Sequence, residues 1–508
     1  MSHDRPMPRK PGLPAALYRA AQVREMDRLS IEAYGIPGDE LMQRAGQAAF
    51  DLLLRRWPDA RRILVFTGTG NNGGDGFVVA RLALQAGLKP RVLQLGDRQR
   101  IAGDAQNNAL RYAALSGEWR AYVDALPQDV DLIVDAVFGT GLERDVEGKW
   151  AQALAQVNAS AAPVLALDIP SGLHADTGRA LGTAVQADAT ISFIGLKQGM
   201  FTADGPACCG AIHFDALDVP ARVYASQILS AKRLDWSRQK QLLQPRSRTA
   251  HKGRYGHVLV VGGTHGYGGA GRLCAEAALR TGAGLVSLAT RAEHVSAVLA
   301  ARPEIMVHQV EEPAQLDHLL EKATVVAVGP GLGTADWGSA LWKKLMDVEL
   351  PLVVDADALN QLARLPQGRD DWVLTPHPGE AARLLACDVD AIHADRFAAV
   401  EKLQRRYGGV AVLKGAGTLV HDGSERPPAV CSDGNPGMAS GGMGDVLTGV
   451  IAGFIAQGWG LAQAAELGVC LHAAAADKAA RAGERGLLAS DLMSHIRRLA
   501  NPNINPTY

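Results

Sequence analysis

The sequence predicts an α/β fold organised as two separate domains. Short runs rich in aliphatic and β-branched residues alternate with helical patterns along most of the 508 residues. Continuous apolar runs of this kind are typical of parallel strands covered by helices on both faces, which gives three-layer α/β/α domains. A chain of this length exceeds what one hydrophobic core normally organises, so we expect two such domains.

The first series of elements fills the N-terminal half of the chain. Residues 62–67, 130–137 and 164–169 have the composition of strands, and residues 76–87 show a helical periodicity that ends in glycine. The second series predicts strands at residues 257–262, 284–289, 324–328, 350–355, 372–374 and 410–413. The two series share an architecture, but no motif recurs in both, so they are not duplicates.

A polar and basic segment, residues 215–253, separates the two series and carries few strand signals. We place the boundary near Ser230, which gives domains of residues 15–229 and 230–500. Each has the size of a complete α/β domain. The last residues, 501–508, are expected to be disordered or to form a docking arm.

The bulk composition argues against several classes of protein. A net charge of −1 gives no general basic field for nucleic acid, and no apolar stretch reaches the roughly 18 residues of a membrane span. The basic, proline-rich residues 1–14 lack the apolar region of a secretory signal. Six cysteines without metal-binding spacing fit a reducing compartment, so we expect a cytoplasmic protein.

Two glycine-rich loops, residues 68–76 and 434–445, each carry an aspartate next to a helical pattern. Glycine lets backbone N–H groups close on a ligand, and the N-terminus of a helix favours an anion such as phosphate. We therefore expect two nucleotide-type sites. The first loop fits a dinucleotide fingerprint poorly, because Asn71, Asn72 and Asp75 crowd the turn.

Polar residues follow three predicted strands of the first half. Besides the loop that holds Asn72, Asp135 ends one strand, and Asp168 ends another shortly before Ser171. Any one of these aspartates alone is more often a turn or a helix cap, but three such strand ends favour a site, because parallel sheets bind ligands there. Asn, Asp and Ser offer hard oxygen ligands for a simple cation, and an unpaired carboxylate can move a proton.

Several stretches of the first half resemble the NAD(P)H-hydrate epimerases. They are Asn-Asn-Gly-Gly-Asp-Gly-Phe-Val-Val-Ala-Arg at residues 71–81, Asp-Ala-Val-Phe-Gly-Thr-Gly-Leu at 135–142, Asp-Ile-Pro-Ser-Gly at 168–172, and the helical stretches 31–37 and 41–46. The resemblance spans most of residues 20–220. It implies a Rossmann-like domain that interconverts the R and S epimers of hydrated NADH and NADPH, called NADHX and NADPHX.

The same resemblance assigns roles to residues of the first half. Asp168 is the expected catalytic residue, for proton transfer at the hydrated nicotinamide. A potassium ion is expected on Asn72, Asp135 and Ser171. Substrate contacts fall on Asn71, Asn72, Gly73, Gly74, Asp75, Gly139, Thr140, Gly141, Leu142, Glu143, Arg144, Asp145 and Asp168.

Three segments of the second half also follow predicted strands: Gly-Pro-Gly-Leu-Gly at residues 329–333, Thr-Pro-His-Pro-Gly-Glu at 375–380 and Lys-Gly-Ala-Gly-Thr at 414–418. Strand ends should bring them to the loop of residues 434–445. There Asp445 is placed to take a proton from a hydroxyl that attacks a phosphate. Lys414 either adds positive charge near a nucleotide or is merely solvated, and His377 is either a contact or a turn residue.

A glycine-rich loop ending in Gly-x-Gly-Asp resembles the ribokinase-like superfamily, in which this aspartate is the catalytic base. Together with residues 253–289, 375–380 and 414–418, the loop is similar to the ADP-dependent (S)-NAD(P)H-hydrate dehydratases over about residues 235–500. The resemblance implies that Asp445 is catalytic, that Ala270, Gly331, His377 and Asp445 contact the hydrate, and that Lys414, Gly415, Ala416, Gly417, Thr418 and Gly444 contact the adenine nucleotide.

The implied dehydration uses ADP to remove a poor leaving group. The C6 hydroxyl of the S epimer, deprotonated by Asp445, attacks the β-phosphate of ADP; AMP leaves, and phosphate then leaves to restore NAD(P)H. Magnesium is expected because the phosphates need charge neutralisation. The epimerase would feed the dehydratase, so that both epimers are repaired. The expected partners are the small molecules NADHX, NADPHX and ADP, without nucleic acid or membrane, and we expect a homo-oligomer.

Two other functions stay open. A small-alcohol kinase of the ribokinase-like superfamily would transfer phosphate stably, but it needs a substrate lid and gives the first half no role. The first half also resembles proteins described as apolipoprotein binders, so it could be a docking module. Its complete set of Asn72, Asp135, Asp168 and Ser171 argues for retained catalysis.

Overall fold

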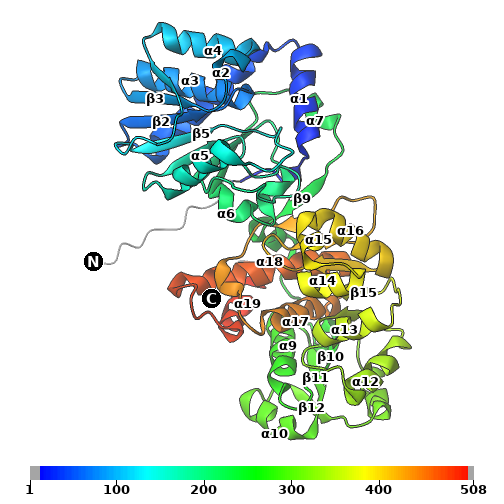
Figure 1. Ribbon diagram of the computed structural model, residues 1–508. Coiled ribbons are helices and arrows are strands. Elements are labelled where there is room, and N and C mark those ends of the chain that lie inside the picture. The colour runs from blue at the N-terminus through cyan, green and yellow to red at the C-terminus, as the bar shows by residue number, and fades with distance from the viewer. Residues whose placement is uncertain (1–11, 502–508) are drawn as a thin grey trace. The chain divides into compact units, whose positions relative to one another are not determined.

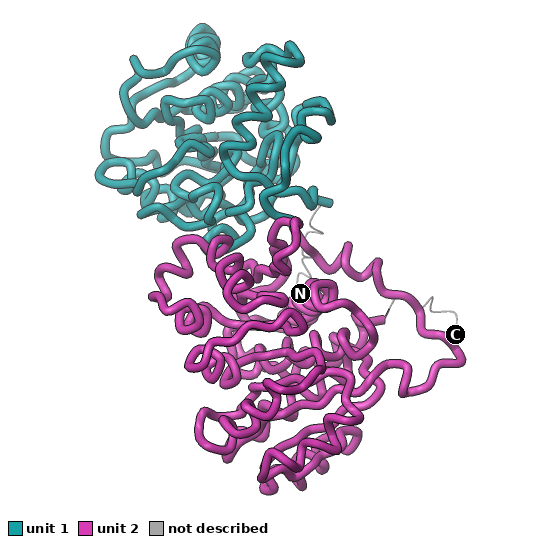
Figure 2. The backbone as a smooth tube through the Cα atoms, turned by 90° about the vertical axis from the view of Figure 1, so that its right-hand side faces the viewer, with its two compact units in different colours: residues 1–232 teal, residues 233–508 magenta. Residues whose placement is uncertain are grey.

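The computed structural model describes residues 12–501. The chain divides between Lys232 and Arg233 into two compact units, named unit 1 and unit 2 (Figures 1 and 2). The tail predicted at residues 501–508 lies, apart from Asn501, outside the described residues. Among the described residues, no helix is both long and apolar enough to cross a membrane.

Unit 1 contains a seven-stranded sheet whose neighbours are all parallel. Its strands are β2 (Arg62–Thr67), β3 (Lys89–Gln94), β4 (Glu118–Ala121), β5 (Leu132–Ala136), β6 (Val164–Leu167), β7 (Ala189–Phe193) and β8 (Ala211–Asp215). The order is β4-β3-β2-β5-β6-β7-β8. Two short strands, β1 (Ala16–Leu17) and β9 (Ala231–Leu234), pair antiparallel with each other.

Helices cover both faces of this sheet. They are α1 (Ala20–Glu32), α2 (Gly38–Arg56), α3 (Asn71–Gln85), α4 (Gly103–Ala114), α5 (Gly148–Ala159), α6 (Gly205–Cys209) and α7 (Ala221–Ala225). Side chains alternate along a strand, so Ile63 and Val65 of β2 pack in the core beneath α1 to α4, whereas Leu64 and Phe66 pack in the core beneath α5 (Figure 1). Both faces are therefore buried, as the continuous apolar runs predict.

Unit 2 is built on a larger mixed sheet. Its strands are β10 (His257–Val261), β11 (Leu285–Thr290), β12 (Met306–Gln309), β13 (Val325–Val328), β14 (Leu352–Val354), β15 (Trp372–Leu374), β16 (Val410–Leu413), β17 (Leu419–His421) and β18 (Ala429–Cys431). Within the unit they run in the order β18-β17-β16-β15-β14-β13-β10-β11-β12. Strands β10 to β16 are parallel to their neighbours, and β17 and β18 are antiparallel.

The helices of unit 2 form two layers (Figure 1). They are α8 (Trp236–Gln239), α9 (Gly268–Thr281), α10 (Ala292–Ala301), α11 (Asp317–Leu320), α12 (Asp336–Met346), α13 (Ala356–Arg364), α14 (Pro378–Leu385), α15 (Val389–Ala394), α16 (Arg396–Tyr407), α17 (Met443–Ala456), α18 (Leu461–Ala479) and α19 (Leu492–Leu499). Helices α9, α17, α18 and α19 share the core on one face with Val258 and Val260. Helices α12 to α16 lie on the other face, as the usual right-handed crossovers between parallel strands predict.

The predicted α/β class is confirmed, and the predicted strands at residues 62–67, 372–374 and 410–413 have the observed bounds. One local expectation is wrong: the helix expected to begin at residue 76 begins at Asn71. Its first turn is therefore made by the residues of the glycine-rich loop. Glycines 73, 74 and 76 lower the helical propensity of this turn, so its sequence shows no helical pattern.

Candidate functional site

The carboxyl ends of β2, β5 and β6 bring predicted residues of unit 1 to one edge of its sheet. Helix α3 starts directly after Gly70 at this edge, and the N–H groups of its first turn have no partners within the helix. A Cβ atom on Gly73 would lie only 2.5 Å from the carbonyl oxygen of Gly68. The loop can fold onto the first turn of α3 because Gly73 has no side chain.

Asn72, Asp135 and Ser171 enclose a group of oxygen atoms at this edge. Ser171 donates from Oγ to Asp135 Oδ1 at 2.6 Å and from its backbone N–H to Oδ2 at 2.8 Å. Asn72 donates from Nδ2 to the carbonyl oxygen of Phe138 at 3.0 Å, but its buried Oδ1 accepts no hydrogen bond from the described residues. Burial raises the pKa of Asp135 to about 6, although Ser171 opposes this shift. A buried acceptor without a donor beside a buried carboxylate favours a cation here.

Asp168, at the end of β6, has a φ of 64°, a left-handed conformation that costs energy for a residue with a side chain. Its Oδ1 forms an ion pair with Nζ of Lys197, whose side chain is 0% exposed. Lys197 also donates to Ser192 Oγ at 3.0 Å and to the carbonyl oxygen of Phe193 at 3.3 Å. All three donors of the ammonium are thus used, and one of them fixes the carboxylate of Asp168.

Two more carboxylates interact with Asp168. Burial raises the pKa of Asp75 well above its usual range, and the charges of Asp168 and Asp27 raise it further, while Lys197 lowers it. The pKa of Asp27, on α1, is raised by burial and by Asp168. One ammonium group does not offset three neighbouring carboxyl groups, and the raised pKa values of Asp75 and Asp27 favour a proton held within the cluster. Such a cluster suits proton transfer to a bound substrate.

Only the first residues of the loop after β5, up to Gly139 and Thr140, lie at this site. A Cβ atom on Gly139 would lie 3.7 Å from Asp168 Oδ2, so a substrate can approach the carboxylate past this glycine. Arg24 of α1 donates to the carbonyl oxygen of Thr140 at 3.1 Å, which holds the loop against α1. The other predicted contacts lie toward solvent, where the exposed residues of the loop are Gly141, Glu143, Arg144 and Asp145.

In unit 2, Lys414 and Asp355 form an ion pair at the carboxyl ends of β16 and β14. Lys414 Nζ lies 2.7 Å from Asp355 Oδ1 and 3.8 Å from Glu380 Oε2. Thr448 of α17 donates to Asp355 Oδ2 at 2.9 Å. Burial opposes both charges, yet Asp355 and Glu380 raise the pKa of Lys414, and Lys414 lowers the pKa of Asp355. Lys414 is thus an ion-paired cation with a side chain only 18% exposed, and not a merely solvated lysine.

Asp445 lies in the first turn of α17, beside this ion pair. Burial, with a smaller contribution from the charge of Asp355, raises the pKa of Asp445 to about 7, against the opposing effect of Lys414. A Cβ atom on Gly444 would lie 3.2 Å from Lys414 Nζ, so a glycine at this position lets α17 approach the lysine closely. A carboxylate with a pKa near neutrality is suited to act as a general base.

Hydrogen bonds to later parts of the chain fix the glycine-rich loop before α17. Asn435 donates from Nδ2 to Asp477 Oδ1 at 2.9 Å, and Ser440 donates to the carbonyl oxygen of Leu487 at 3.0 Å. Gly442, the residue before α17, has a φ of 87°, which favours glycine. Nothing lies within 4 Å of a Cβ atom built on Gly441. The first turn of α17 is therefore open to an anion such as a phosphate.

His377 caps α14 through its side chain. Its Nδ1 accepts from the backbone N–H of Gly379 at 3.0 Å, and Glu380 Oε2 accepts from the N–H of His377 at 2.8 Å. Burial lowers the pKa of His377, and Lys414 and Arg383 lower it further. Because Nδ1 accepts, the neutral ring carries its proton on Nε2, which can donate to a ligand.

The segment of residues 414–418 is held by a buried arginine. Arg396 donates to the carbonyl oxygens of Leu413, Lys414 and Gly417 at 3.3, 3.2 and 3.4 Å. Its side chain is 1% exposed, and burial lowers its pKa to about 10. The backbone that carries the predicted nucleotide contacts, namely Lys414, Gly415, Ala416, Gly417 and Thr418, is therefore rigidly supported.

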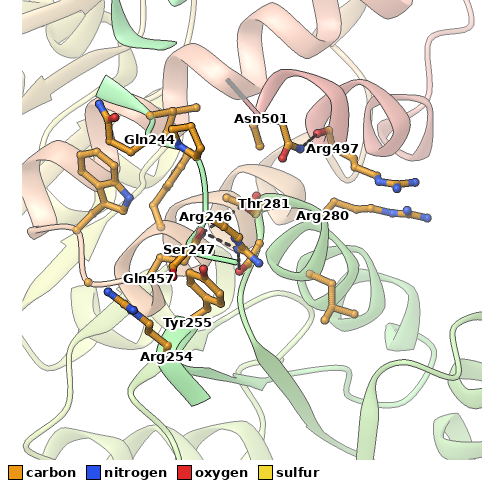
Figure 3. A pocket seen from close by; sticks show the side chains of 18 of the residues that line it. Gln244, Arg246, Ser247, Arg254, Tyr255, Arg280, Thr281, Gln457, Arg497 and Asn501 are labelled. Carbon is orange, nitrogen blue, oxygen red and sulfur yellow. Dashed lines mark hydrogen bonds between the residues drawn. The ribbon is translucent and has the colours of Figure 1, made fainter. Parts of the chain in front are cut away.

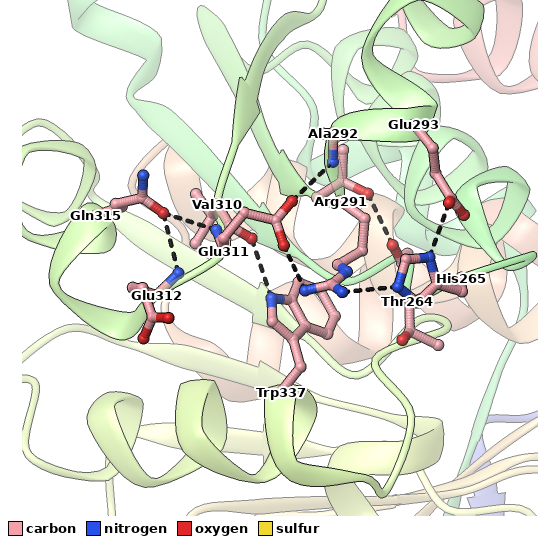
Figure 4. Close-up of polar contacts among 12 residues, drawn as sticks. Thr264, His265, Arg291, Ala292, Glu293, Val310, Glu311, Glu312, Gln315 and Trp337 are labelled. Atoms are coloured by element: carbon pink, nitrogen blue, oxygen red, sulfur yellow. Dashed lines mark hydrogen bonds and ion pairs between the residues drawn. The ribbon is translucent and has the colours of Figure 1, made fainter.

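Ala270 and Gly331 lie together at the N-terminus of α9. A Cβ atom on Gly331 would lie 3.2 Å from Cβ of Ala270, and the carbonyl oxygen of Gly331 accepts from the N–H of Thr264 at 2.6 Å. A polar network braces this loop (Figure 4): Arg291 contacts His265 Nε2 at 2.6 Å and Glu311 at 2.5 Å. The network ties the loop before α9 to the ends of β11 and β12.

Several residues of these sites were not predicted as site residues, among them Lys197, Asp355, Asp27 and Arg396. Lys197 has a signal in the sequence, because it is the only charged residue between Asp188 and Asp204. Asp355 has one as well, at the end of a predicted strand. Asp27 and Arg396 lie on helices among other polar residues, and only the tertiary fold brings them to the sites.

Comparison with known proteins agrees with both predicted families. Residues 258–498 match the family model described as NAD(P)H-hydrate dehydratase, and residues 38–199 match the one described as YjeF-related protein N-terminus. A ribokinase-like superfamily protein from Enterococcus faecalis V583 matches with 27% identity and a TM-score of 0.50, over 54% of this chain and 96% of that one. The expectation of a ribokinase-like fold is thereby confirmed.

Two curated relatives match over almost the whole chain. The bifunctional NAD(P)H-hydrate repair enzyme Nnr of Coxiella burnetii is 49% identical over 96% of this chain and 99% of its own length. The protein of the same name from Escherichia coli is 44% identical over 99% of this chain and 97% of its own. At this identity and coverage, the chain belongs to the family of bifunctional NAD(P)H-hydrate repair enzymes.

Proposed function

We propose that unit 1 interconverts the R and S epimers of NADHX and NADPHX, and that unit 2 dehydrates the S epimers with ADP as co-substrate. The observation that carries the proposal is the position of Asp445 in the first turn of α17, with its pKa raised to about 7 by burial. A base and an open phosphate cradle then lie at the same helix N-terminus.

In unit 1, we assign the proton transfer at the hydrated nicotinamide to Asp168. Lys197 holds this carboxylate, and the raised pKa of Asp75 supplies a neighbouring group that keeps a proton. The first turn of α3 offers free N–H groups to the phosphates of the substrate. Gly139 leaves room for the hydrated ring beside Asp168.

The oxygen atoms of Asn72, Asp135 and Ser171 fit a potassium ion. The support is the unpartnered Oδ1 of Asn72 and the fully buried carboxylate of Asp135. When bound, K⁺ would supply positive charge to offset Asp135 and to attract a phosphate. Asp135 and Ser171 would hold it in place, and Asn72 would also fix the first turn of α3.

In unit 2, Asp445 takes the proton of the C6 hydroxyl, and the oxygen forms a bond to the β-phosphorus of ADP. The bond between that phosphorus and the bridging oxygen breaks, which releases AMP. The phosphate ester at C6 then leaves with its oxygen, pushed by the N1 lone pair, and the loss of a C5 proton restores NAD(P)H. We assign the orientation of the hydrate to His377 Nε2 and to the backbone at Gly331; the support is that Nδ1 of His377 is fixed by the N–H of Gly379 and that Gly331 lies against Ala270.

The expected magnesium ion would arrive with the phosphates. Among the described residues, no cluster of three His, Cys, Asp or Glu side chains could hold a metal by itself. Asp355, Glu380 and Asp445 nevertheless surround one ammonium group, so the site has negative charge to share with a divalent cation. Mg²⁺ would supply charge neutralisation at the transferred phosphate.

A cytoplasmic location is part of the proposal, because all six cysteines are free thiols, four of them with a pKa raised by burial. The expected homo-oligomer, the NADHX-versus-NADPHX preference, and the assignment of residues 15–229 and 230–500 to the two activities stay predictions.

The test is a mixture of R- and S-NADHX with ADP and Mg²⁺, followed by the absorbance of NADH. Wild type should convert both epimers completely. Asp168→Asn should convert the S fraction and then only follow spontaneous epimerisation, whereas Asp445→Asn should form no NADH while epimerisation persists by chromatography. A stable phosphorylated alcohol in place of NADH would favour the kinase, and a unit 1 without epimerase activity would favour the docking module.

A further inference from the structure

Unit 2 contains a large cavity at the edge of its sheet opposite to the candidate active site. Its volume is about 1020 Å³. Tyr255 and Glu304 in its wall lie two residues before β10 and β12, at the amino ends of these strands. Phe454 and Thr281, in the last turns of α17 and α9, also line it. The first turns of the same two helices carry Asp445 and Ala270, about 15 Å away along the helix axes.

Arginine is the commonest residue type in the wall of this cavity, and Figure 3 labels Arg246, Arg254, Arg280 and Arg497. Glu276 and Glu304 are the acidic residues in the lining. The arginines are Arg246, Arg248, Arg254, Arg280, Arg302 and Arg497. Positive charge therefore exceeds negative charge by four, in a chain whose net charge is −1. A concentration of one sign in a concave surface attracts ligands of the other sign.

Half of these arginines have a structural role. Arg246 donates to the carbonyl oxygen of Gly282 and to Gln457 Oε1, and its guanidinium lies 3.7 Å from the centre of the Tyr255 ring. Arg280 and Arg302 both pair with the buried Glu276, at 3.6 and 2.5 Å. These three side chains are positioned before any ligand arrives, which lowers the entropic cost of binding.

The other three arginines have no carboxylate within 4.0 Å among the described residues. They are the exposed Arg248, Arg254 and Arg497. The charge of Arg497 has a structural explanation: the residue lies in the last turn of α19, where a cation offsets the negative end of the helix dipole. The same explanation does not apply to Arg248, which lies in a loop, or to Arg254, which lies in a short 3-10 turn.

We propose that this cavity is a second ligand site, which binds a small molecule carrying several phosphate groups. Six guanidinium groups spread over this volume cannot converge on one monoanion, whereas a chain of phosphates can reach several of them. Arginine binds phosphate oxygens in a planar, bidentate manner, which suits such a ligand better than a diffuse counter-ion. The site is separate from the phosphate cradle at α17, because the two lie at opposite ends of that helix.

The test compares three full-length proteins by isothermal titration with inorganic tripolyphosphate. They are wild type, the cavity variant Arg248→Ala/Arg254→Ala/Arg497→Ala, and the control variant Arg426→Ala/Arg481→Ala/Arg498→Ala. The control residues are exposed arginines of unit 2 outside the cavity, so both variants lose the same charge. Binding at the active site is common to all three proteins.

Wild type and the control should bind one more equivalent of tripolyphosphate than the cavity variant, or bind that equivalent at least about tenfold more tightly. Equal binding by all three proteins would overturn the proposal, because the active site alone would then account for it. Equal losses in both variants would also overturn it, in favour of non-specific charge. A change of sedimentation confined to the cavity variant, without a binding difference, would instead assign the arginines to contacts between copies of the chain.

Discussion

Lys197 Nζ is ion-paired with Asp168 Oδ1 in a place where the lysine side chain has no exposure to solvent. A buried ammonium is costly unless a carboxylate and other acceptors surround it, and Ser192 and Phe193 complete its shell. The pair therefore fixes the position of the carboxylate that we assign to proton transfer.

We expect Lys197→Met to abolish most epimerase activity and to leave dehydratase activity intact. Without the ammonium group, the pKa of Asp75 should rise further, because Lys197 now lowers it, and unit 1 should lose about 3 kcal/mol of stability or more. The epimerisation rate should fall by about 10²- to 10⁴-fold at neutral pH. Lys149→Met, at an exposed lysine of α5, is the control. An unchanged rate in a folded Lys197→Met protein would refute the role of this pair.

The dehydratase should show a pH profile governed by Asp445. A base must be ionised to act, and burial raises the pKa of Asp445 to about 7. The value of kcat/KM for S-NADHX should therefore rise with pH up to about 7 and level off above it. A profile that is flat between pH 5 and 8 would argue against this base.

Asp355→Asn should move the rising limb of that profile to lower pH. Asp355 raises the pKa of Asp445, and its removal also frees Lys414 to stabilise the ionised Asp445. Thr448→Val is the matched control, because it removes a hydrogen bond to Asp355 and no charge. The two variants should differ in the midpoint of the profile; a shared midpoint would contradict the electrostatic coupling.

Arg396→Met should weaken the binding of ADP more than it slows catalysis. Arg396 donates to three backbone carbonyls of the segment that carries the predicted nucleotide contacts, and it lies on α16, away from the reacting atoms. Misplacement of that backbone should raise the KM for ADP about ten- to a hundredfold. Arg405→Met, an exposed arginine of the same helix, should not. A loss confined to kcat would show that Arg396 acts on chemistry instead.

Much of the fold could be predicted because the buried strands are continuous apolar runs. The strands at residues 62–67 and 410–413 were identified with their bounds, whereas β3 and β8, interrupted by charged or polar residues, were not. A strand at a sheet edge or with partly exposed side chains has no clear pattern of apolar residues, so its sequence resembles that of a loop.

The candidate site was predictable where chemistry is concentrated in one short segment. Asp168, Asp445 and the glycine-rich loops follow predicted strands, and their type indicates their chemistry. Pairing is different: Lys414 meets Asp355, and Lys197 meets Asp168, across long stretches of chain. Charge state depends on such distant partners and on burial, which the sequence does not display. For the same reason, the sequence left Lys414 open as a solvated lysine, whereas its side chain is ion-paired and only 18% exposed.

The potassium assignment leads to a prediction about stability and pH. The pKa of Asp135 is raised by burial from 3.8 to about 6, so the folded chain binds its proton more tightly than the unfolded chain. Ionising Asp135 therefore costs about 3 kcal/mol of stability as pH rises from about 4 to 6 in the absence of a cation. K⁺ on the ionised carboxylate should recover part of this loss. We expect added K⁺ to raise the Tm of unit 1 at pH 8 and to have little effect at pH 5, where a proton competes for Asp135.

In Asp135→Asn both the pH dependence and the response to K⁺ should disappear, while Asp59→Asn, at an exposed carboxylate, should keep them. Epimerase activity should follow the same K⁺ requirement and dehydratase activity should not. An equal Tm shift with K⁺ in wild type and Asp135→Asn would place the cation elsewhere.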